Sequence, residues 1–139
     1  MHGPVVGVAA HDTLWQAMDR MLTAHLRHVA VVEDGRALGL LSDRDLASVW
    51  ALDPLGLKHR IARDVLGVDP PFIAPDLDVI SASRRLLEAG IDALLVVDAT
   101  DRAIGVLTDH DLLAVMVDLY QGREGHGDHT ARHSMMSPD

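Results

Sequence analysis

The sequence of 139 residues contains no cysteine, and this absence excludes a group of chemistries. Without a thiol the chain has no disulfide, no cysteine nucleophile and no cysteine-ligated zinc or iron–sulfur site. An absence of cysteine fits a reducing compartment, and we expect a cytoplasmic protein. The chain also lacks any apolar run close to the ~20 residues needed to cross a bilayer, so we expect no membrane-spanning segment.

Aromatic and basic residues are also scarce. Aromatic side chains make up only 3% of the sequence, so the core must be aliphatic. The chain has 12 basic against 21 acidic residues, which gives a formal net charge of −9. This acidity disfavours adhesion to nucleic acid or to an anionic membrane surface, and we expect neither as a partner. Apolar residues at 48% are typical of a globular protein that can bury a core.

An internal repeat organises the chain. Residues 34–47 (DGRALGLLSDRDLA) superpose on residues 100–113 (TDRAIGVLTDHDLL) at an offset of 66 residues. Upstream the offset is 65, pairing Leu14 with Val79 and Val31 with Val96, because the second copy gains one residue in a loop. A match of this density predicts two copies of one structural unit.

Each copy is predicted to fold as strand, helix, strand, strand, helix. In the first copy Thr13-x-x-Gln16 matches a helix-capping box, and apolar residues then recur at helical spacing. Asp34-Gly35 between two apolar runs predicts a tight hairpin. The second copy has Asp78 as the predicted N-cap of its first helix and Gly90 as the C-cap. We expect the last helix over residues 108–120.

The duplicated motif places a hydroxyl at the start of each second helix and a carboxylate three residues later, as Ser42 with Asp45 and Thr108 with Asp111. Such a hydroxyl can donate to a phosphate or ribose oxygen, and the free amides of the first turn favour an anion. The carboxylate can accept from a cis-diol. The alternative interpretation is that these residues only cap their helices. A glycine inside the preceding strand, Gly39 or Gly105, can mark the close approach of a ligand or another backbone. In the alternative interpretation these glycines only relieve crowding.

The sequence resembles a tandem pair of CBS domains, the cystathionine β-synthase type of regulatory repeat, paired as a Bateman module. The resemblance covers about residues 1–120. It is carried by residues 27–32 (RHVAVV) with 34–46 (DGRALGLLSDRDL), and by residues 93–98 (ALLVVD) with 105–112 (GVLTDHDL).

The resemblance implies a non-enzymatic module that binds AMP, ADP, ATP or S-adenosylmethionine as a regulatory ligand in clefts between the two repeats, with no required cofactor. Ser42, Asp45, Thr108 and Asp111 would contact the phosphate or ribose, and Arg44 and His110 are positioned to meet a phosphate. Adenine would lie against the first two strands of each copy, which implicates the following residues: Gly7, Val8, His28, Val29 and Ala30 in the first copy, and Phe72, Ile73, Ala93 and Leu94 in the second. Phe72 is expected to fill the adenine slot or to stack on the base.

The expected fold is α/β (α+β), with two pseudo-symmetric β-α-β-β-α repeats packed through their sheets. We assign residues 1–52 to the first repeat, 53–60 to a linker, 61–121 to the second repeat and 122–139 to a flexible tail. Apolar residues cover more than one stripe of the last helix, which predicts a homodimer. A ligand signal would then be read by an effector protein, and a ligand-free dimerisation or interaction module is the alternative.

We predict no catalytic residue. Asp43-x-Asp45 after an apolar strand resembles the nucleophile motif of haloacid-dehalogenase-type phosphatases, but that chemistry needs a basic partner, and the only lysine, Lys58, lies in the predicted linker. His126, His129 and His133 in the predicted tail have the spacing of a metal-binding tract, and adventitious affinity is the expected behaviour there. No metal site is therefore assigned.

Overall fold

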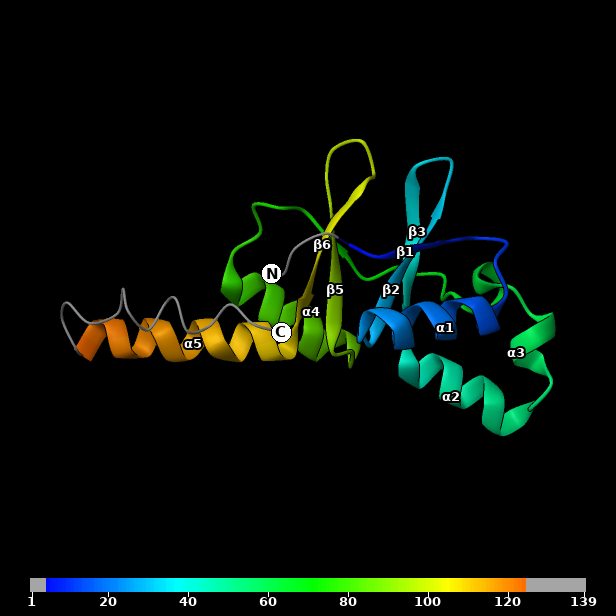
Figure 1. Ribbon diagram of the computed structural model, residues 1–139. Helices are drawn as coiled ribbons and strands as arrows, with labels where there is room; N and C mark the ends of the chain where they lie inside the picture. The colour runs from blue at the N-terminus through cyan, green and yellow to red at the C-terminus, as the bar shows by residue number, and fades with distance from the viewer. Residues whose placement is uncertain (1–4, 125–139) are drawn as a thin grey trace.

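The computed structural model describes residues 5–124, which fold as two β-α-β-β-α units (Figure 1). The first copy consists of β1 (Gly7–Ala9), α1 (Leu14–Ala24), β2 (His28–Glu33), β3 (Arg36–Ser42) and α2 (Asp43–Leu52). The second copy consists of β4 (Phe72–Ile73), α4 (Val79–Ala89), β5 (Ala93–Val97), β6 (Ala103–Thr108) and α5 (Asp109–Glu124). Between them lie α3 (Gly56–His59) and a 3-10 helix (Ala62–Val65). The predicted order of elements is confirmed.

Helix α1 begins, and helix α4 begins and ends, at the residues that the sequence predicts. Thr13 caps α1 by accepting from the amide of Gln16, whose side chain accepts in return from the Thr13 amide. Asp78 caps α4 by accepting from the Ser81 amide at 2.7 Å, and this bond lowers the pKa of the Asp78 carboxyl. Gly90 ends α4 in the left-handed conformation at φ 65°.

Each copy forms a three-stranded sheet in which the first strand pairs parallel to the second and the second pairs antiparallel to the third. The β2–β3 hairpin turns at Asp34 and Gly35, both with positive φ, as the Asp-Gly pair predicts. The longer β5–β6 loop turns at Asp101 with φ 65°, and the Asp98 carboxylate accepts from the amides of Thr100 and Arg102. These hydrogen bonds lower the pKa of Asp98.

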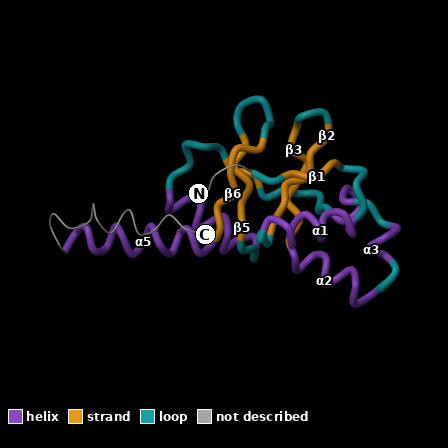
Figure 2. Tube along the Cα trace, viewed as in Figure 1, coloured by secondary structure: helices purple, strands orange, loops and turns teal. Residues whose placement is uncertain are grey.

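The two copies pack through their sheets, as predicted. A cluster between the sheets contains Ala30, Ala37 and Leu95, with Phe72 and Val106 packed against it. The amide of Ala37 also donates to the carbonyl of Asp101 at 2.7 Å, which links the two hairpins. The helices lie along one side of the molecule and the hairpin loops along the other (Figures 1 and 2).

The chain between the copies is more structured than the predicted polar linker. Its Leu57, in α3, is only 6% exposed and joins the core of the first copy. The amides of Ala62 and Arg63 donate to the carbonyls of Asp12 and Ala10 at 2.8 and 3.0 Å. The crossing segment, residues 53–66, therefore covers one side of the first copy, because its apolar side chains gain burial there.

Helix α5 is longer than the sequence predicted. It continues through residues 121–124, so residues 122–124, which we assigned to a flexible tail, are helical. Gln, Arg and Glu are good helix formers and offset the cost of the single Gly122. The rest of the predicted tail, residues 125–139, lies outside the described residues. Within residues 5–124, none of the helices combines the length and apolar character that spanning a membrane requires.

Candidate ligand-binding site

Strand register brings several predicted site residues to one edge of the first sheet. Gly7 pairs with Ala30 across β1 and β2, and His28 pairs with Ser42 across β2 and β3. The second sheet repeats this arrangement, with Phe72 opposite Leu95 and Ala93 opposite Thr108. In each copy the duplicated motif therefore begins its helix beside the start of the second strand, which is where sequence reasoning expected a ligand.

The motif residues of the first copy cap helix α2. Ser42 Oγ accepts from the Asp45 amide at 3.1 Å, and the Asp45 carboxylate accepts from the Ser42 amide at 2.8 Å. These are the bonds that the capping interpretation predicts. A hydroxyl that accepts can still donate, and a carboxylate has room for more than one donor. Capping is therefore compatible with ligand contacts from the same two side chains.

The second copy forms the same capping box, but its carboxylate is more buried. Thr108 Oγ1 accepts from the Asp111 amide at 3.2 Å, and the Asp111 carboxylate accepts from the Thr108 amide at 2.9 Å. Asp111 is only 7% exposed, whereas Asp45 is exposed. The two carboxylates thus share a local geometry but differ in their access to solvent.

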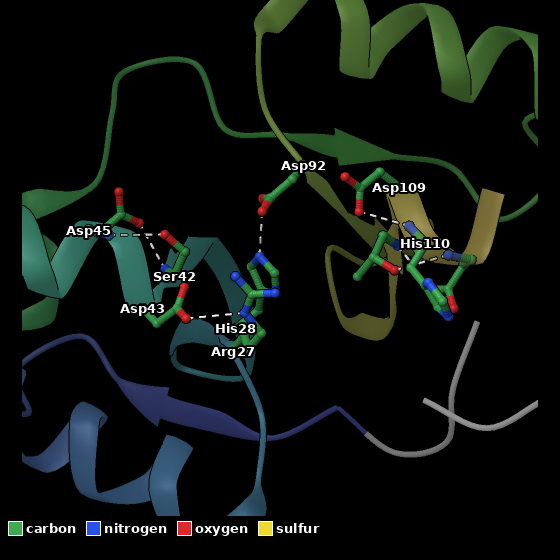
Figure 3. A network of polar contacts seen from close by, with 10 residues as sticks. Arg27, His28, Ser42, Asp43, Asp45, Asp92, Asp109 and His110 are labelled. Atoms are coloured by element: carbon green, nitrogen blue, oxygen red, sulfur yellow. Dashed lines mark hydrogen bonds and ion pairs between the residues drawn. The ribbon is translucent and has the colours of Figure 1, made fainter. Parts of the chain in front are cut away.

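A histidine joins the two copies near these motifs. His28 Nε2 lies 3.3 Å from Asp92 Oδ1, and the His28 side chain is only 11% exposed (Figure 3). Beside it, Arg27 Nε donates to Asp43 Oδ2 at 3.2 Å. This polar network therefore runs from the Ser42–Asp45 helix start to the loop before β5. The sequence analysis did not assign Asp92 or Asp43 to a site, although the 65-residue offset pairs Asp92 with Arg27.

The network carries different charges in the two copies. The Asp43 amide donates to the Arg27 carbonyl and the Asp109 amide to the Asp92 carbonyl, both at 2.9 Å, so these positions are structurally equivalent. The first copy therefore pairs an arginine with an aspartate where the second has two aspartates. The following positions hold Arg44 and His110, both exposed. Positive charge is thus concentrated at the first copy's helix start.

The residues expected to face adenine are mostly buried in apolar packing. Val8 and Val29 belong to the core of the first copy, and Ile73 and Leu94 to the core of the second. The following side chains are no more than 5% exposed: Val8, Val29, Ala30, Ile73, Ala93 and Leu94. Phe72 packs into the cluster between the sheets. A base placed here would meet strand backbone rather than these side chains.

Close packing explains why residue 39 is a glycine. A Cβ at this position would lie 2.8 Å from Leu66 Cδ2, closer than real Cβ contacts allow. The glycine therefore admits the Leu66 side chain of the crossing segment, which agrees with the relief of crowding that the sequence analysis gave as the alternative to a ligand's approach.

Residues 5–124 contain no group of three or more histidine and acidic side chains that could hold a metal ion. The tract of His126, His129 and His133 lies outside the described residues. The side chains at the candidate site offer hydrogen-bond donors, hydrogen-bond acceptors and charge for the recognition of a ligand.

Comparison with known sequences finds the same domain twice. The profile of the CBS domain family matches residues 1–51 and 62–118. A homoserine O-acetyltransferase of Methanococcoides burtonii is 32% identical over 93 residues, which are 66% of this chain but 18% of that protein. The uncharacterised protein MK0525 of Methanopyrus kandleri is 29% identical over 63% of this chain and 44% of its own length. The chain thus spans less than half of these curated relatives.

Solved structures share the fold. The CBS domain pair of protein MJ0100, in complex with 5′-methylthioadenosine and S-adenosyl-L-methionine, superposes with a TM-score of 0.72 at 17% identity, covering 81% of this chain and 92% of that one. CBSX2 in complex with AMP superposes with a TM-score of 0.68 at 24% identity, covering 84% of this chain and 88% of that one. The cytosolic domain of the Mg²⁺ channel MgtE in complex with ATP superposes with a TM-score of 0.66 at 25% identity, covering 80% of this chain and 44% of that one.

Proposed function

This chain belongs to the CBS domain family, and from that membership we propose that it is a non-enzymatic sensor of an adenosine-containing ligand. The ligand class is AMP, ADP, ATP or S-adenosylmethionine, bound in clefts between the two repeats. The observation that carries the proposal is the duplicated hydroxyl and carboxylate motif, at equivalent helix starts in both copies. Proteins of the same fold hold such ligands: S-adenosylmethionine in MJ0100, AMP in CBSX2 and ATP in MgtE.

The chemistry of the first copy suits a phosphorylated ligand. Ser42 would donate to a phosphate or ribose oxygen, and Asp45 would accept from the ribose hydroxyls. A chain with net charge −9 needs local cations to hold a polyanion, and Arg27 and Arg44 supply them beside this helix start. Because both arginines are exposed, salt should weaken the binding of such a ligand.

A bound ligand would act on the contacts that join the copies. The His28–Asp92 pair and the apolar cluster between the sheets lie between the two repeats, so a ligand that favours one arrangement of these groups shifts the relative placement of the helices. We propose that an effector protein in the cytoplasm reads this shift.

Large apolar side chains on the helical side support a homodimer. Among the most exposed are Leu22 at 67%, Trp50 at 58%, Ile80 at 70% and Leu87 at 83%. Exposed apolar surface of this kind marks an interface. Light scattering at micromolar concentration should give about twice the 15.0 kDa chain mass, and a stable particle of the chain mass contradicts the dimer.

The second candidate is a ligand-free dimerisation and interaction module. The observation in its favour is that all four motif side chains take part in capping boxes, which retain these residues without any ligand.

Calorimetry with AMP, ATP and S-adenosylmethionine separates the two candidates. The sensor predicts micromolar binding of at least one ligand, lost in the Asp45→Ala/Asp111→Ala double variant. The matched control is Thr13→Ala, which breaks the capping box of α1 away from the motifs and should retain binding. If none of the three ligands gives a measurable heat of binding, or if the Thr13→Ala control loses binding as much as the double variant does, the sensor proposal is wrong.

A further inference from the structure

The two motif helices differ in the charge of the residue that packs beside their first turn. In the first copy Arg27 Nε donates to Asp43 Oδ2 at 3.2 Å, and the Arg27 side chain is 72% exposed (Figure 3). In the second copy Asp92 occupies the position of Arg27, and Asp109 that of Asp43. A cation beside the first motif is therefore replaced by an anion beside the second.

The Arg27 side chain is suited to a phosphate. A guanidinium has five N–H donors in a planar fork, and the bond to Asp43 uses one of them. The same bond holds the guanidinium beside the first turn of α2, which Ser42 caps. A fork held in this way can donate to two oxygens of one phosphate. Arg27 can therefore add a charge-assisted contact to the hydrogen bond that Ser42 offers.

The start of α5 has the opposite character. The Asp109 amide donates to the Asp92 carbonyl at 2.9 Å, so the backbone holds these two acidic residues together beside the Thr108 motif. Neither position supplies an arginine. A phosphate monoester carries about −1.5 to −2 charges at pH 7, and like charges at short range repel each other. The second copy therefore disfavours the group that the first copy favours.

We propose that a phosphorylated adenosine ligand binds at the first copy alone, and that Arg27 and Asp92 determine this preference. Arg27 binds the phosphate at the start of α2. Asp92 and Asp109 repel it from the start of α5, and this leaves the second site to an adenosine ligand without a phosphate. The inference rests on the proposed function, since it assigns one chemical class of the proposed ligands to one of the two sites.

AMP and adenosine differ only in the phosphate, so titrations with both isolate the phosphate contact. In isotope-labelled protein the Asp45 and Asp111 amides report the two sites by NMR, because each lies in the first turn of its motif helix. The dissociation constant of AMP should be at least about ten-fold lower at Asp45 than at Asp111. For adenosine the two constants should agree within about three-fold.

Arg27→Asp gives the first copy the residue type of the second. It should raise the AMP dissociation constant at Asp45 at least about ten-fold and change that of adenosine by less than about three-fold. The matched control is Arg36→Asp, which makes the same change of charge at an exposed residue. Arg36 begins β3 and Ser42 ends it, so the control lies at the far end of the strand from the helix start. It should leave the AMP constant within about three-fold. Equal weakening by the two substitutions overturns the inference.

Asp92→Arg makes the reverse exchange, and its new arginine can pair with Asp109. The AMP constant at Asp111 should fall at least about ten-fold. Asp92→Asn keeps a hydrogen-bonding group beside His28 and should cause a smaller change in the same direction. An unchanged constant in both Asp92 variants, equal AMP constants at the two sites of the natural chain, or binding of adenosine without AMP overturns the inference and leaves the sensor standing. If AMP, adenosine and S-adenosylmethionine all fail to bind, both proposals are wrong.

Discussion

The two copies share one local design but differ in what covers them. Among residues 5–124, the core cluster of the first copy contains twelve buried residues and that of the second contains six. The larger cluster includes Leu57 and Ala62 of the crossing segment, which has no described counterpart on the second copy. The core of a repeat therefore depends on the chain packed over it as well as on its own strands and helices.

The copies also differ in charge at matched positions. Arg27 faces Asp43 in the first copy, and Asp92 with Asp109 replaces that pair in the second. His28 of the first copy lies 3.3 Å from Asp92 and so links this position to the first copy. The two copies thus share their helix caps but differ in the charges beside them.

The largest effect is expected where the crossing segment enters the first core. Replacing Leu57 by alanine should lower the free energy of unfolding by about 2–5 kcal/mol, because the side chain is 6% exposed and leaves a cavity. The control Leu55→Ala, at a position 71% exposed, should cost less than about 0.5 kcal/mol. Urea denaturation measures both, and equal midpoints would show that the cover adds nothing to the first copy.

A smaller effect on stability is expected from substitution of the two motif carboxylates, and it should differ between them. Asp45→Ala should cost about 0.5–1 kcal/mol, because it removes one hydrogen bond, from the Ser42 amide, at an exposed helix start. Asp111→Ala should cost about 1–3 kcal/mol, because the 7% exposed carboxylate leaves the Thr108 amide without its acceptor. The two variants are compared by urea denaturation under one set of conditions. An equal or reversed order would mean that burial does not distinguish the copies at this motif.

The smallest expected effect is on the stability of the protein at acidic pH. The Ser81 hydrogen bonds hold the pKa of Asp78 below its ordinary value of 3.8, so the folded state favours the carboxylate. This stabilisation is present above pH 3.8 and is lost as the pH falls through the lowered pKa. Asp78→Thr copies the uncharged cap of Thr13, and its stability should fall less steeply with acid than that of the natural chain. Denaturation midpoints between about pH 4 and pH 2 measure this difference, and parallel curves would contradict it.

Local chemistry made much of the fold predictable. Thr13 with Gln16, Asp78 and Gly90 mark helix ends because side chains or a positive φ satisfy nearby backbone groups there. Asp34-Gly35 determines its hairpin for the same local reason. The repeat offset then places Ser42 and Thr108 at matched sites, so the candidate motif also follows from the sequence.

Other features depend on contacts between distant residues, which carry no local signal. The sequence shows that Gly39 is small, but only the packed structure shows that Leu66 needs the space. It shows His28 and Asp92, but only the packing of the two sheets brings them within 3.3 Å.

The repeat can be read by comparing the sequence with itself, and the order of helices and strands and the caps follow from residues only a few positions apart. The packing of the whole chain adds two features: the crossing segment contributes Leu57 and Ala62 to the first core, and Leu66 fills the space beside Gly39. These features depend on burial, and the burial of a side chain depends on which distant parts of the chain pack against it.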